Sequence, residues 1–264
     1  MKFKKIYKIR LICCLFGIVF IYAFFHIVCW LVDNHRINKN ISKISNVNIE
    51  EIVDDNEETL INPPNDKDDP YWQFIKYSLL DINFDELKKT NKDTVGWLQI
   101  NNTNINYPYV QGKDNEFYLN HTFDKSYNDA GWLFLDYRND PEGFERNNII
   151  YGHSRLNKTL FGTLKEVLKT AWFNEKSNHL IKISTPQVKS LWQIFSVYES
   201  DDDYHISVGI ENDMAFELFI NNIKNKSKYS FNVEVNTNDK ILTLSTCRDN
   251  SKKLIVHAKL IKSG

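Results

Sequence analysis

Cys247 is the residue whose type and setting most clearly suggest chemistry. It ends the segment LTLSTC (residues 242–247), whose alternation predicts a strand with Thr243, Ser245 and Cys247 on one face. A cysteine at a strand end, beside polar side chains and before a turn, is placed like a site residue, and its thiolate would be a nucleophile. The alternative is a small hydrophobic residue, a role that free cysteines often have.

A nucleophilic thiol needs a base or a cation nearby to form the thiolate. His153 is the best partner by position, because it follows the apolar strand pattern NIIYG (148–152) and precedes a polar loop. The other six histidines lie in the apolar N-terminal segment, the polar segment after it, polar loops, or a strand pattern where the ring can simply face solvent: His26, His35, His121, His179, His205 and His257.

The elements that must position these two residues have mostly a β pattern. Short runs rich in β-branched and aromatic residues predict strands at 95–100, 105–110, 117–119, 131–136, 148–151, 180–184, 191–198, 231–235, 241–246 and 254–261. Helical spacing predicts helices over 71–90 (one or two), 160–172 and 213–224. The expected fold class is mostly β with α insertions, a closed barrel of about eight strands with helices between them.

The N-terminus predicts a membrane anchor. Five Lys and Arg residues and no acid precede an uncharged apolar run at 11–32, and 22 residues exceed the roughly 20 that span a bilayer. The positive-inside rule places residues 1–10 in the cytoplasm. A cleaved signal peptide is the rival, but bulky residues follow where a small-residue cleavage site would be needed. Residues 33–69 are expected to form a polar stalk, helical in part at 44–53, and residues 70–264 the folded domain that carries Cys247 and His153.

This topology bears on the cysteines. Three of the four lie in the apolar run, at Cys13, Cys14 and Cys29, so Cys247 has no partner for an internal disulfide outside the membrane. It is therefore an intermolecular partner, an inert buried residue or a nucleophile.

Composition and the absence of certain motifs argue against several classes of function. The chain has 264 residues, 42% of them hydrophobic, which fits one domain of about 200 residues with appendages or two small domains. A net charge of −1 gives no footprint for nucleic acid. No G-x-G-x-x-G, G-x-x-x-x-G-K or zinc-ligand spacing occurs, so no cofactor or metal is expected.

The segments YGH (151–153) and TLSTC (243–247) behind a signal-anchor resemble a sortase, a cysteine transpeptidase of Gram-positive cell surfaces. The similarity runs over roughly residues 70–262. Several segments resemble class B sortases in particular. They are DTVGWL (93–98), YP (107–108), VQG (110–112), NEFYLN (115–120), GWLFLDYR (131–138), FG (161–162) and the helix before the Cys strand. The resemblance implies an eight-stranded sortase-type β-barrel with N-terminal helices, preceded by one transmembrane helix.

The resemblance also implies a reaction and its partners. Cys247 would attack the Thr carbonyl of an NPxTN-like sorting signal near the C-terminus of a surface protein. An amine of peptidoglycan or of its lipid-linked precursor would then resolve the thioester, with His153 moving the protons. The enzyme would sit in the cell membrane as a single-pass protein with an extracellular catalytic domain.

The family also uses an arginine at the start of the strand after the Cys to stabilise the oxyanion. Here Lys253 occupies that position, and lysine lacks the bidentate fork of arginine. Arg248 is the second candidate, although its place directly after Cys247 points it to the other face.

Substrate contacts are implied at Asn115 and Leu119, which match the wall that holds the Asn and Pro of the motif. Ser245 and Thr246, next to Cys247, and Tyr204, in the loop before the last helix, would line the groove. Two alternatives to the transpeptidase stay open. One is a thiol hydrolase or protease of surface proteins, and the other is a catalytically weak surface scaffold.

Overall fold

A closed barrel of eight strands forms the centre of the domain. The computed structural model describes residues 2–44, 47–54, 56–247 and 252–264. The strands follow one another around the barrel in the order β10-β8-β7-β3-β4-β5-β6-β9. Their bounds are β3 Thr94–Ile100, β4 Asn106–Val110, β5 Phe134–Leu135, β6 Asn147–His153, β7 Leu180–Ser184, β8 Lys189–Ser200, β9 Ile241–Cys247 and β10 Lys253–Ser263. The sequence-based expectation of about eight strands in a closed barrel is confirmed.

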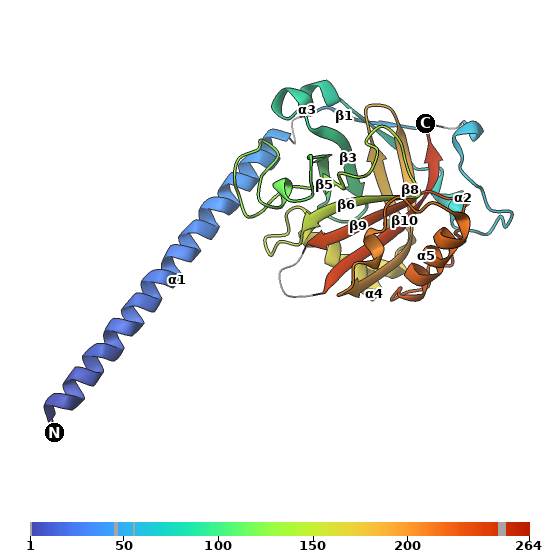
Figure 1. Cartoon of the computed structure of the whole chain (residues 1–264). Coiled ribbons are helices and arrows are strands. Elements are labelled where there is room, and N and C mark those ends of the chain that lie inside the picture. The colour runs from blue at the N-terminus through green and yellow to red at the C-terminus, as the bar shows by residue number, and fades with distance from the viewer. Residues whose placement is uncertain (1, 45–46, 55, 248–251) are drawn as a thin grey trace.

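The pairing of β6 with β9 has a direct consequence for function. These neighbours are parallel, whereas β10 is antiparallel to both β8 and β9. Because parallel strands run in the same direction, the C-terminal ends of β6 and β9 meet at one rim of the barrel. Figure 1 shows β6, β9 and β10 side by side on the face of the domain nearest the viewer.

Helices and short turns cover the barrel. The helices are α1 Lys2–Ile44, α2 Tyr71–Phe74, α3 Phe84–Thr90, α4 Thr170–Asn174 and α5 Asp213–Asn225, and the 3₁₀ turns are η1 Glu57–Thr59, η2 Phe117–Leu119, η3 Phe161–Leu168, η4 Lys176–His179 and η5 Tyr204–Ile206. Helix α5 begins at Asn212, whose side-chain oxygen accepts from the amide of Ala215, a normal N-cap. It buries Phe216, Phe219 and Ile223. The predicted helix before the Cys strand is confirmed.

Several local expectations were wrong. Residues 117–119 form the turn η2 rather than a strand, and 231–235 form no strand. Residues 79–82, expected as helix, form β2 (Leu79–Ile82), which pairs with β1 (Ile49–Ile52) in a separate two-stranded sheet. Residues 160–172 form η3 and then α4 instead of one helix. In each case pairing or packing with distant residues outweighed the local periodicity.

The N-terminal helix α1 joins the apolar run to the domain without interruption. Its part from Arg10 to Ile44 is long and apolar enough to cross a membrane by length and composition. Figure 1 shows it projecting from the domain, with its C-terminal end against the domain loops. The segment expected as a polar stalk, 33–69, contains the end of this helix, β1 and η1.

Candidate active site

The two residues predicted to carry the chemistry end neighbouring strands. His153 is the last residue of β6 and Cys247 the last residue of β9, and the two are paired Cα to Cα in the parallel register. Neighbouring strands lie about 4.8 Å apart, and paired residues project from the same face of a sheet. The side chain of Cys247 lies outside the described part of the structure, so its backbone alone locates it.

The ring of His153 is oriented by a main-chain acceptor. Its Nε2 lies 2.7 Å from the carbonyl oxygen of Leu119. Since a carbonyl can only accept, Nε2 carries a proton and donates, and Nδ1 is the basic nitrogen of the neutral ring. Leu119, predicted as a substrate contact, is thus brought to the site, and its backbone holds the imidazole.

Gly152 explains how the strand can end in this position. A Cβ at Gly152 would lie 2.3 Å from Leu133 Cδ2 and 2.8 Å from Phe161 Cδ2, both buried side chains. A larger residue would therefore push the end of β6 away from the core. The YGH pattern combines this close approach with a half-exposed histidine at the strand end.

Lys253 begins β10 on the other side of β9. The antiparallel register ends at the pair of Ile255 with Ser245, and beyond it the amide of Leu254 bonds the side chain of Thr246. Lys253, the residue before Leu254, therefore begins β10 close to the end of β9. The ammonium group of Lys253 forms an ion pair with Asp203 in the loop before η5. A positive charge is therefore placed beside the Cys strand end. The other candidate cation, Arg248, falls outside the described residues.

Ser245 and Thr246 have different surroundings. Ser245 is buried, and its Oγ lies 2.9 Å from Nε2 of His205. Thr246 points to the opposite face, where its Oγ1 accepts from the amide of Leu254 at 2.8 Å. Thr246 therefore fastens β9 to the start of β10.

A buried polar chain continues along β9 below Ser245. His257 is fully buried, with Nδ1 2.9 Å from Thr243 Oγ1 and Nε2 3.1 Å from the hydroxyl of Tyr198. Thr243 in turn donates to Asn147 Oδ1. The expectation that His257 can face solvent was wrong, because β10 lies between β8 and β9 and this face is covered by α5. Burial lowers the pKa of His257 well below its ordinary value.

His205 was placed in a polar loop by the sequence and is instead fully buried. Burial, and next the charge of Lys253, lower the pKa of its imidazole to about 4. Asn147 fixes the backbone here by donating to the carbonyl oxygens of His205 and Ser207. The neighbouring Tyr204 is half-exposed and stacks on Phe219 of α5. The loop carrying Tyr204 and His205 therefore flanks the Cys strand.

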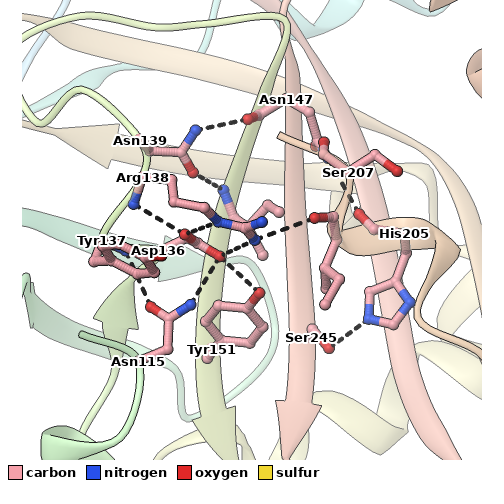
Figure 2. A network of polar contacts seen from close by, with 12 residues as sticks. Asn115, Asp136, Tyr137, Arg138, Asn139, Asn147, Tyr151, His205, Ser207 and Ser245 are labelled. Atoms are coloured by element: carbon pink, nitrogen blue, oxygen red, sulfur yellow. Dashed lines mark hydrogen bonds and ion pairs between the residues drawn. The ribbon is translucent and has the colours of Figure 1, made fainter. Parts of the chain in front are cut away.

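A second polar cluster, missed by sequence reasoning, lies beside β6 (Figure 2). The buried carboxylate of Asp136 accepts two bonds from the guanidinium of Arg138, at 2.8 and 2.7 Å, one from the backbone amide of Arg138 at 3.0 Å, and one from the hydroxyl of Tyr151 at 2.9 Å. Burial raises the pKa of Asp136, but these hydrogen bonds outweigh it and leave the pKa lowered. An acid and an arginine directly after the apolar segment 131–135 were the available signal.

Asn115 belongs to this cluster. Its amide donates to Asp136 at 3.0 Å, and its oxygen accepts from the backbone of Tyr137. The cluster also reaches the loop at η5, since Arg138 donates to the carbonyl of Ile206. Asn115 thus anchors its loop to the barrel next to Tyr151, two residues before the histidine that ends β6.

Comparisons with known proteins point to one family. The sortase domain model matches residues 98–261. The chain is 36% identical to sortase B of Staphylococcus aureus over 184 residues, which are 68% of this chain and 75% of that protein. A solved sortase B complexed with triglycine is similar with a TM-score of 0.65 and 36% identity, covering 68% of this chain and 85% of that one. Sortase B of Bacillus anthracis gives a TM-score of 0.70 at 29% identity, covering 89% and 99%.

Proposed function

The chain belongs to the sortase family and is similar to sortase B, and from this premise we propose that it is a membrane-anchored cysteine transpeptidase with Cys247 as nucleophile and His153 as proton carrier. The observation that supports this most strongly is the register that pairs the two residues at the ends of neighbouring parallel strands. Each residue ends a strand at the same rim, where a substrate chain can reach both.

The reaction proceeds in two halves. The Cys247 thiolate attacks the Thr carbonyl of an NPxTN-like sorting signal, the peptide C–N bond breaks, and His153 gives a proton to the leaving amine. A cell-wall amine, from peptidoglycan or its lipid-linked precursor, then attacks the thioester. His153 takes the proton of that amine, a new amide forms and the thiol is regenerated. The sortase B complexed with triglycine holds a peptide with such an amine.

Lys253 supplies the positive charge of the site in this proposal. It begins β10 close to the end of β9, where a cation stabilises the oxyanion that forms during each attack. Asp203 holds its ammonium group in place. Arg248 is the alternative cation, and substitution of each residue in turn distinguishes the two.

The sorting signal lies between two walls. The loop of Asn115 and Leu119 forms one wall, braced by Asp136. The loop of Tyr204 forms the other, with Ser245 between them and Thr246 holding the strand from behind. We assign direct contact with the motif to Asn115, Leu119 and Tyr204 of these walls, while Ser245 and Thr246 position the strand between them. Tyr204 offers an exposed aromatic ring.

The apolar part of α1, residues 11–32, anchors the enzyme in the cell membrane. Five cations before it keep residues 1–10 in the cytoplasm and place the domain from residue 70 on outside the cell. Residues 33–69 connect the two. This arrangement brings the site close to its surface-protein and cell-wall substrates and raises their effective concentration.

Mass spectrometry of the full chain tests the proposal. We expect an NPxTN-type peptide to leave an acyl adduct on Cys247, and triglycine to remove it as ligated peptide. Cys247→Ala should show no adduct, while the matched control Cys29→Ala keeps it. Hydrolysed product only, with triglycine present, would favour the thiol hydrolase. No adduct from any peptide of a sorting-signal panel would favour the scaffold and contradict the proposal.

A further inference from the structure

The end of α1 packs on the catalytic domain rather than passing it. Asn34, Ile37, Asn40 and Ile44 are buried and recur at helical spacing, so one face of the helix lies against the domain. The residues between them on the other face, such as His35 and Lys39, are exposed. Since helix α1 is continuous from Lys2 to Ile44, the apolar run and the packed face belong to the same helix.

The contacts at the start of the packed face involve two loops of the site. Arg155 Nη2 and Asn157 Nδ2 donate to Asn34 Oδ1, at 2.8 and 3.0 Å. Asn128 Nδ2 donates to the carbonyl oxygen of Asp33 at 3.1 Å. The first loop follows the strand end of β6 directly, and the second follows the turn η2, whose last residue holds the ring of the site histidine.

These contacts lie next to the end of the apolar run. Val32 is its last residue, and a helix rises about 1.5 Å per residue, so Asp33 and Asn34 lie within one turn of it. The two loops are therefore held at the level where the run leaves the hydrocarbon. Each loop also carries an exposed apolar or aromatic side chain: Leu156 is 86% and Tyr127 is 63% exposed.

We propose that the loop 154–158 and the turn at Tyr127 lie in the headgroup layer of the same bilayer that holds α1. Leucine at this depth contacts the acyl boundary, and tyrosine is enriched at the membrane interface. The exposed Lys158 adds charge that anionic headgroups attract. The proposal rests on the membrane anchoring proposed above. The proposal goes beyond membrane anchoring, because it gives the catalytic domain one fixed orientation relative to the bilayer. Anchoring through a flexible connection would leave that orientation free.

Lipid quenching of a single label on the full chain tests this orientation. An environment-sensitive fluorophore is attached to Leu156→Cys, in a chain whose Cys13, Cys14, Cys29 and Cys247 are replaced by Ser. Two further labels serve as references: Phe20→Cys inside the apolar run, and Leu218→Cys, an exposed position on α5. The chains are reconstituted in vesicles that contain doxyl-labelled phosphatidylcholine and an anionic lipid.

We expect the label at position 156 to shift to the blue and to be quenched by shallow doxyl groups, while the label at position 218 stays unquenched. Quenching at position 20 with none at 156 would overturn the inference and leave the anchoring intact. No quenching at position 20 would overturn the anchoring itself, and the inference with it.

A second variant tests whether the contacts of α1 set the orientation. Asn34→Ala removes the acceptor shared by Arg155 and Asn157, so the quenching at position 156 should weaken. Asn38→Ala, exposed and one helical turn from Asn34, is the matched control and should change nothing. Equal quenching in both variants would show that this contact does not orient the domain.

Discussion

At the scale of single residues, a main-chain contact orients the imidazole of the site. The carbonyl oxygen of Leu119 lies 2.7 Å from Nε2 of His153 and accepts its hydrogen bond. The register of β6 with β9 then places the backbone of Cys247 beside that of His153.

A glutamine at position 153 separates orientation from proton transfer. The side-chain amide of His153→Gln can still donate to the Leu119 carbonyl, so the fold should be kept, but it cannot carry a proton. We expect kcat for ligation of a sorting peptide to triglycine to fall by about 10²- to 10⁴-fold. The control His35→Gln, exposed on α1, should keep the original rate. Near-normal turnover in His153→Gln would remove His153 from the mechanism.

Lys253 is tested by changing its charge and its shape separately. Lys253→Met removes the cation near the end of β9, and kcat should fall by about 10²-fold, as for the loss of one oxyanion donor. Lys253→Arg should keep or raise kcat, because the guanidinium adds a bidentate fork. Lys252→Met, an exposed neighbour, is the control. If Lys253→Met ligates as fast as the unmodified enzyme, while Arg248→Met does not, the cation is Arg248.

At the scale of elements, β9 is fastened on both faces. Thr246 bonds the backbone of β10, and Thr243 and Ser245 bond Asn147 and His205 on the opposite face. The end of β6 approaches the core closely at its glycine, where a Cβ would overlap buried side chains. The position of the two strand ends is therefore a property of packing around them as well as of their own sequences.

Alanine at position 152 should disturb this packing. The added Cβ would overlap Leu133 and Phe161, and we expect Gly152→Ala to lower the free energy of unfolding by about 1–3 kcal/mol. The transpeptidation rate should fall further than stability alone explains, because His153 moves with the strand end. Gly143→Ala, where a Cβ meets only a carboxylate oxygen of Asp140 at 3.4 Å, is the control. Equal effects of the two substitutions in urea titrations would contradict the packing argument.

At the scale of the whole molecule, the barrel holds two neutral histidines beneath the Cys strand. His205 and His257 are both fully buried, and burial lowers both pKa values. In the unfolded chain their pKa values return to about 6.5. As the pH falls below about 6.5, the unfolded state therefore binds protons that the folded state does not, and the protein loses stability.

This predicts a steep acid limb in the stability profile. For His205, a folded pKa of about 4 against 6.5 corresponds to a loss of about 3 kcal/mol between pH 6.5 and 4. Urea unfolding at several pH values measures it, and His205→Gln should show a shallower slope by about one proton. An unchanged slope in His205→Gln would mean that this histidine is protonated without cost in the folded state.

The sequence alone indicated the individual elements of this protein and its candidate site residues. Alternation and strand-end position made Cys247 and His153 candidates, and the resemblance to sortases selected them as the proposed pair. Apolar length indicated the α1 span and periodicity indicated α5, because each of these signals lies within a few neighbouring residues. The tertiary structure decided that β6 and β9 pair in parallel, so that their ends meet at one rim. It also decided the ion pair of Lys253 with Asp203 and the burial of His205 and His257. Such contacts join residues far apart in the chain, and their energies depend on packing and desolvation that no local pattern carries.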